Sequence, residues 1–178
     1  ATSGLKSDRK ALKLAATNYA NAVRLYKKDS VVLAIEARKV AAITVKIGFV
    51  AGLTSSYSGG DDYASYLDKA SGDLKTHKAS LEALELTNED AKAYRDASSK
   101  LADEIGESIS KLKTAYAGGD QATIDLTKAS MLTGILSSSA VEKEKTINEK
   151  LSVSGESFKK VEDARNALNS EIAKFNAR

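Results

Sequence analysis

The side chain with the clearest capacity for chemistry is the single histidine of the sequence, His77. Asp73 precedes it by four positions, so on a helix the two side chains share one face and could supply two metal ligands. A metal site needs further ligands, and the chain lacks the Glu-x-x-His pairs that helical di-iron proteins use. We therefore interpret His77 as a partly buried core histidine, held by a neighbouring carboxylate or carbonyl, and expect no metal site.

Two groups of acidic residues could do general acid–base work, but only if burial separated their pKa values. They alternate with lysines and lie mostly off the apolar positions, which is typical of a solvated helix face with ion pairs. The groups are Glu82, Glu85 and Glu89, and Asp103, Glu104 and Glu107. The chain has no cysteine, no glycine-rich phosphate loop after a strand and no G-x-S-x-G motif. We expect no enzymatic activity and no bound cofactor.

The overall composition points to helices. The sequence contains no proline, a residue that breaks helix interiors, whereas strong helix formers such as Ala, Lys, Leu and Glu are abundant. No apolar run is long enough for an ordinary membrane-spanning helix. The net charge of +3 is spread along the chain, which argues against a nucleic-acid partner. The sequence therefore predicts an all-α protein.

Two short segments share one pattern and divide the chain into three arms. The first corner is Tyr57-Ser58-Gly59-Gly60-Asp61-Asp62, and the second is Tyr116-Ala117-Gly118-Gly119-Asp120-Gln121. Glycine can take the left-handed conformation that ends a helix, and aspartate can cap the next one. We expect a single helical domain over residues 1–178, with arms at about 5–57, 61–117 and 120–177 and both Gly-Gly pairs outside helix.

Each arm carries the seven-residue periodicity of packed helices. In the first arm apolar or aromatic residues recur every seven positions from Leu5 to Ile47 without a miss. The second and third arms alternate spacings of four and three, which predicts antiparallel packing in a bundle. The residues that we expect in the core are Leu81, Leu84, Leu101, Leu151, Phe158, Val161, Leu168 and Ile172.

Each arm also has a point where the helix could break. These points are residues 27–30, residues 86–90, where Thr87 and Asp90 resemble a helix start, and residues 137–142, where Ser139 and Glu142 fit a capping box. We expect an elongated up-down-up bundle of three long arms, each able to break at its middle. The alternative is six shorter helices in a more globular bundle.

The residues that could contact a partner gather near the first corner. The segment 40–53 has one charge, Lys46, in fourteen residues, and Tyr57, Tyr63 and Tyr66 follow it. Tyrosine buries much area at little entropic cost, and clustered apolar area at a bundle end exceeds what that end needs to cover itself. The expected interaction residues are Phe49, Leu53, Tyr57, Tyr63 and Tyr66. The alternative is that this segment is buried and the tyrosines wrap the bundle end.

These features favour a non-enzymatic helical structural or interaction protein that assembles with its own copies or binds another surface component. The start Ala1-Thr2-Ser3-Gly4 resembles a terminus left by cleavage after a small residue, and with the hydroxyl-rich, cysteine-free composition it predicts export to the periplasm, the cell surface or the medium. The first alternative is an extracytoplasmic sensor or adaptor with a ligand pocket near Arg165 or His77. Arg165 and Ser154 are the polar residues at core positions of the third arm, and they could equally fix its register. The second alternative is a membrane-active protein that touches a bilayer peripherally through residues 40–57.

Overall fold

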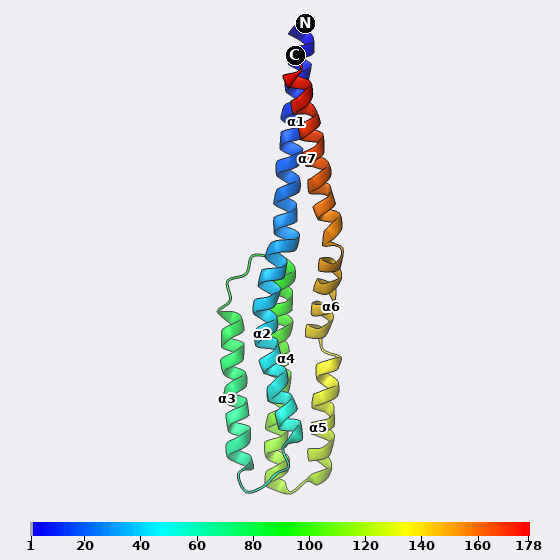
Figure 1. Cartoon of the computed structure of the whole chain (residues 1–178). Helices are drawn as coiled ribbons and strands as arrows, with labels where there is room; N and C mark the ends of the chain where they lie inside the picture. Colours follow the sequence, from blue (N-terminus) through cyan, green and yellow to red (C-terminus); the bar gives the residue numbers. More distant parts are fainter. Residues whose placement is uncertain (1) are drawn as a thin grey trace. The chain divides into compact units, whose positions relative to one another are not determined.

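The computed structural model describes residues 2–178, and nearly all of them are helical (Figure 1). No strand occurs within this range, so the all-α prediction is confirmed. The helices are α1 (Thr2–Tyr26), α2 (Leu33–Ser56), α3 (Tyr63–Glu82), α4 (Glu89–Gly118), α5 (Gln121–Leu136), α6 (Ser139–Ser152) and α7 (Ser154–Asn176), and a π-helical segment, η1 (Lys27–Val32), joins α1 to α2.

The chain forms two compact units. Unit 1 contains the chain up to Ala34 together with Asn148–Arg178, and unit 2 contains Ile35–Ile147. Because α2 and α6 each contribute residues to both units, the boundaries fall inside helices and not in linkers. The expectation of a single helical domain stays a prediction.

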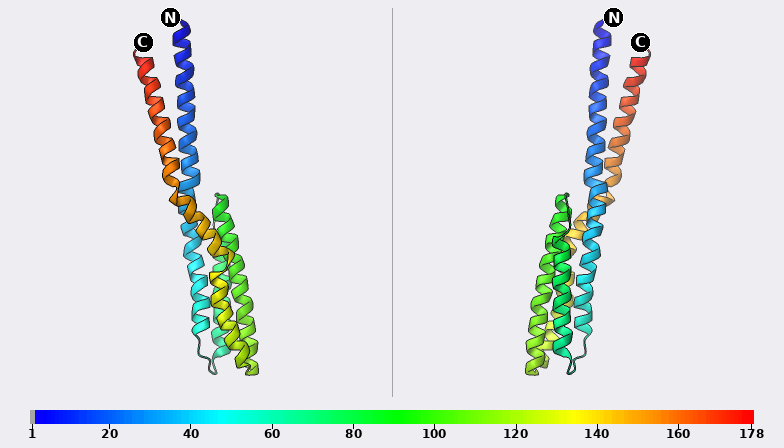
Figure 2. Two further views of the ribbon diagram at one scale, coloured as in Figure 1. Left: turned by 90° about the vertical axis from the view of Figure 1, so that its right-hand side faces the viewer. Right: turned by 90° about the vertical axis from the view of Figure 1, so that its left-hand side faces the viewer.

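Unit 1 is built on an antiparallel pair of helices, α1 and α7 (Figure 2). The rings of Tyr26 and Phe158 lie 5.7 Å apart at one end of the pair. At the other end, the guanidinium of Arg178 forms an ion pair with the carboxylate of Asp8. These contacts join the two ends of the chain within one unit.

The α1–α7 pair corrects part of the predicted core. No residue of α7 is buried, and Phe158 and Ile172 are 47% and 39% exposed. One neighbouring helix covers only one side of an apolar stripe, and the rest of the stripe stays in contact with water. Val161 and Leu168, predicted as core on α7, are half-buried for the same reason, and Leu151, predicted as core near the end of α6, is half-buried too.

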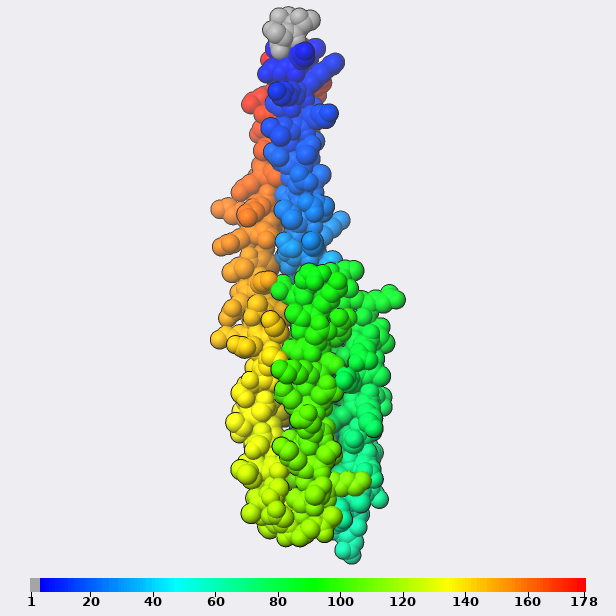
Figure 3. All heavy atoms as spheres, turned by 180° about the vertical axis from the view of Figure 1, so that it is seen from behind, coloured from blue at the N-terminus to red at the C-terminus, as the bar shows by residue number. Residues whose placement is uncertain are grey.

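Unit 2 holds most of the buried apolar residues. Its helices α2, α3, α4 and α5 alternate in direction, and α2 and α4 lie on opposite sides of the space between α3 and α5 (Figures 1 and 3). Of the residues predicted for the core here, Leu81 and Leu101 are buried, which confirms that prediction. Leu84 is only half-buried, because α3 has already ended and Leu84 lies in the loop before α4.

The second arm does not run in one direction. Its predicted break becomes a reversal at residues 83–88, after which α4 returns antiparallel to α3 and packs against it (Figure 2). The first arm is not interrupted by a loop at residues 27–30. The chain stays helical there, because the π-helical segment η1 connects α1 to α2. In the third arm helix is interrupted at residues 137–138, close to the predicted point, and again at Val153.

Both glycine corners form as predicted, with one shift. Gly59 and Gly60 lie outside helix with φ of 86° and 138°, and Gly119 ends α4 with φ of 65°. Gly118, expected outside helix, is the last residue of α4, because one left-handed residue is enough to end a helix. The carboxylate of Asp120 then caps α5 by accepting the N–H of Thr123 at 3.1 Å.

Candidate interaction surface

Helix α2 carries two rows of residues on opposite faces, each with alternating spacings of four and three. We call the first the inner row, Ala37, Val40, Thr44, Ile47, Ala51 and Thr54, and the second the outer row, Arg38, Ala42, Val45, Phe49, Gly52 and Ser56. Every member of the inner row is buried except Thr44, whose hydroxyl is 2.7 Å from that of Ser98 on α4. Every member of the outer row is exposed except the half-exposed Gly52. One helix therefore has a packed seam and a second, uncovered one.

The outer row and its neighbour Leu53 form an exposed apolar surface. Val45, Phe49 and Leu53 are 56%, 64% and 63% exposed, although they are large apolar side chains on a well-formed helix. A Cβ atom added at Gly48 or Gly52 would meet no atom of another helix within 4 Å, so no described helix packs directly on these two positions. Two of the predicted interaction residues, Phe49 and Leu53, therefore lie open at the surface.

The other three predicted interaction residues form one cluster of rings with Tyr116 at the end of the bundle. Tyr57 stacks on Tyr66 with ring centroids 4.2 Å apart, and Tyr63 stacks on Tyr116 at 5.6 Å. Tyr57 also meets the edge of Tyr116 at 6.0 Å, so the two glycine corners touch through their tyrosines. All three predicted tyrosines are half-buried. Much of their ring surface is thus used inside the chain.

Polar contacts fix the same corner. The hydroxyl of Tyr57 donates to the carboxylate of Asp62, and this hydrogen bond raises the pKa of Tyr57 to about 12. The ammonium of Lys128 on α5 donates to the carbonyl of Tyr57 and lies 5.7 Å from the ring centre of Tyr116. Tyr116 could be anticipated from the repeated corner pattern, whereas nothing in the sequence distinguishes Lys128 from the other lysines.

A buried carboxylate that the sequence analysis missed connects α2 to the start of α4. Glu36 accepts hydrogen bonds from the N–H and hydroxyl of Thr87 at 2.7 and 2.8 Å and from the N–H of Asn88 at 2.8 Å. Burial alone would raise the pKa of Glu36, but these bonds and the charge of Lys39 outweigh it, and the pKa is lowered. Asn88 itself caps α4 by accepting from the N–H groups of Asp90 and Ala91. Glu36 thus holds the loop that reverses the second arm.

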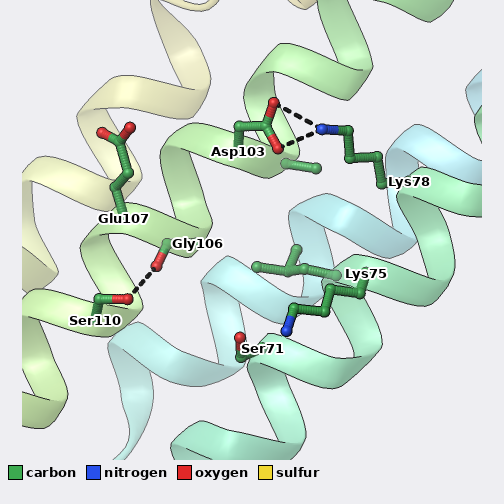
Figure 4. Close-up of a pocket in the computed structure, with 9 residues that line it drawn as sticks. Ser71, Lys75, Lys78, Asp103, Gly106, Glu107 and Ser110 are labelled. Carbon is green, nitrogen blue, oxygen red and sulfur yellow. Dashed lines mark hydrogen bonds and ion pairs between the residues drawn. The ribbon is translucent and has the colours of Figure 1, made fainter.

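A shallow pocket of about 280 Å³ lies between α3 and α4 (Figure 4). Lys78 and Asp103 face each other across it with Nζ–O distances of 2.8 and 3.0 Å, and this bond raises the pKa of Lys78. Lys75 lies on the α3 side and Glu107 on the α4 side. The charges of Lys78 and Asp103 neutralise each other.

The residues that the sequence offers as candidates for chemistry do not come together in one site. His77 is half-buried on α3 but does not line the pocket, and Asp73 pairs with Lys69 at 2.8 Å. Arg165 is exposed and Ser154 half-exposed on α7. The two acidic groups are exposed, as the sequence predicts, on the surfaces of the α3–α4 hairpin and its loop.

The described residues, 2–178, contain neither a candidate metal site nor a candidate membrane-spanning helix. No three His, Cys, Asp or Glu side chains there converge as metal ligands. None of the helices in that range combines the length and the apolar character that crossing a bilayer requires. Comparison of the chain with protein-family models, with curated proteins and with solved structures finds no significant match.

Proposed function

We propose that this protein is a non-enzymatic helical interaction module that contacts a protein partner through the outer face of α2. The partner is either a second copy of the chain or another component of the surface to which the chain is exported. We keep export as part of the proposal, and fractionation of cells of its source is the measurement that tests it.

The observation that carries the proposal is the outer row of α2 with Leu53 beside it. An apolar row with heptad spacing is the pattern by which one helix packs on another, and here no helix within residues 2–178 covers it. Val45, Phe49 and Leu53 keep more than half of their surface in water. Covering them would recover roughly 25 cal/mol per Å² of apolar area before the costs of association.

The tyrosine corner extends this surface at one end. Tyr57, Tyr63 and Tyr66 keep part of their surface exposed beside the last turn of α2. Ring stacking, on one another or on Tyr116, already restricts these side chains. They would therefore lose little conformational entropy on contacting a partner. We assign Phe49 and Leu53 the central role and the three tyrosines a place at the rim.

The test is site-specific photo-crosslinking in cells that express the chain. A photoreactive residue placed at Phe49 is expected to give one defined adduct, with a copy of the chain or with one other protein. The matched control is the same residue at Leu126, which is 70% exposed on α5 of the same unit and lies outside the outer row. Equal labelling at both positions, or no adduct at Phe49, would overturn the proposal.

A further inference from the structure

We infer that the occupant of the outer face of α2 is α2 of a second copy of this chain, running antiparallel to the first. This inference rests on the proposed function and names the partner. It follows from the order of residue sizes and charges along the outer row.

The sizes along the outer row are self-complementary in one antiparallel register. If each residue i of one copy lies opposite residue 94 − i of the other, Val45 meets Phe49 and Ala42 meets Gly52. In this register the large side chains fill the centre on both sides of the two-fold axis. The small pair at each end lets the two backbones approach, because no atom lies within 4 Å of a Cβ added at Gly52. The same patch thus serves both copies, as a two-fold interface requires.

The charges along α2 favour the same direction. Arg38 and Lys39 lie exposed near one end of the row, and no acidic residue occurs from residue 37 to residue 60. Asp61 and Asp62 follow at the other end, beyond Ser56. An antiparallel pair brings the basic end of each copy, where Arg38 lies opposite Ser56, next to the acidic corner of its partner. A parallel pair would place Arg38 beside Arg38 and repel.

The contact is long enough for two helices to recognise each other. From Arg38 to Ser56 the outer row covers 19 residues, and its two ends lie about 27 Å apart along the helix at the usual rise. Its apolar centre is flanked by polar or charged residues at both ends, the arrangement of a small protein interface with a dry centre and a wet rim. The geometry points to a weak or moderate dimer and not to an obligate one, since the surface is only one helix wide.

The absence of cysteine in the chain allows a direct test by disulfide trapping. Two single variants are made, Ala42→Cys and Gly52→Cys, and are mixed under oxidising conditions. In the antiparallel register position 42 of one copy faces position 52 of the other, so the mixture is expected to shift to twice the mass of one chain. Positions 42 and 42, or 52 and 52, are about 15 Å apart along the axis, too far for a disulfide, so each variant alone is expected to run at the mass of one chain on a denaturing, non-reducing gel.

The controls separate this inference from the proposed function. Both positions are surface sites, and thermal melts of the reduced variants confirm that they fold. Disulfides that link each variant to itself, with no mixed disulfide between positions 42 and 52, would mean a parallel pair and would overturn the antiparallel inference. If the mixture forms no disulfide while the photoreactive residue at Phe49 labels a different protein, the inference of a second copy is wrong and the proposed function stands. If position 49 labels nothing either, both fail.

Discussion

Glu36 is the residue on which the reversal of the second arm depends. Its two carboxylate oxygens accept three hydrogen bonds from Thr87 and Asn88, two of them from backbone N–H groups. Hydrogen bonds to a charged group are stronger than neutral ones, and a buried donor left unpaired costs its desolvation. Glu36 therefore contributes to stability through its charged form.

The variant Glu36→Gln is expected to lower the free energy of unfolding by about 1.5–3 kcal/mol near neutral pH, because an amide is a weaker acceptor and can present an N–H group to donors. The pKa of Glu36 is lowered in the folded chain, so its contribution is present above the ordinary value of 4.5 and is lost as the pH falls through the folded-state pKa. Denaturant unfolding of both proteins between neutral and acidic pH measures this. The difference between them is expected to shrink toward acid; a difference independent of pH would contradict the assignment.

The sequence did not reveal Glu36, and the reason is physical. A glutamate on an amphipathic helix is most often solvated, and its burial here depends on a loop 51 residues away. The start of α4 was nearly predicted: Thr87 was expected to resemble the cap, whereas Asn88 occupies that position and Thr87 donates to Glu36 instead. Local cap patterns define a helix start only to within a residue, since neighbouring polar residues compete for the same N–H groups.

At the scale of elements, α2 is the helix whose two faces differ most in their surroundings. Ile47 on the inner row is fully buried, and Phe49 two residues later is mostly exposed. From its sequence, the charge-poor segment 40–53 is compatible both with burial and with a contact surface. One face of this segment is buried and the other is exposed, and seven-residue periodicity alone could not separate the two faces because both rows have it.

Replacing Ile47 by Ala is expected to cost about 2–5 kcal/mol of stability, because the substitution leaves a cavity in a packed core. Replacing Phe49 by Ala is expected to change the stability of the isolated chain by less than about 0.5 kcal/mol, as for other surface sites. Thermal or chemical denaturation of the two variants at a concentration where the chain is monomeric measures both. Equal losses would mean that Phe49 packs within its own chain and would remove the basis of the contact surface.

At the scale of the whole molecule, burial is distributed unequally between the two units. Helix α4 contributes ten buried residues to unit 2, whereas α7 contributes none to unit 1. The seams of both helices look alike in sequence, with apolar residues at spacings of four and three. What the sequence could not show is the number of neighbours around each helix, and this number decides whether a seam position becomes core.

This inequality predicts the order in which parts of the chain open. Helices with few buried apolar contacts open at low free energy, and those in a packed core exchange only on global unfolding. In native-state hydrogen exchange, amides in the middle of α7 are expected to exchange faster than those in the middle of α4 by orders of magnitude. Equal protection in the two helices would show that the α1–α7 pair is covered in solution, and α4 provides the internal reference.

The pairing of α1 with α7 has a consequence for how the chain is made. The ion pair between Asp8 and Arg178 joins residues separated by 170 positions, so Asp8 cannot find this partner until Arg178 has been synthesised. At about 5–20 residues per second the first helix waits roughly 10–30 s after its emergence from the ribosome. During this interval α3 and α4, which are joined by a short loop, can already pack against each other. A newborn chain therefore exposes the apolar stripe of α1, and this is the stage at which chaperones would meet it.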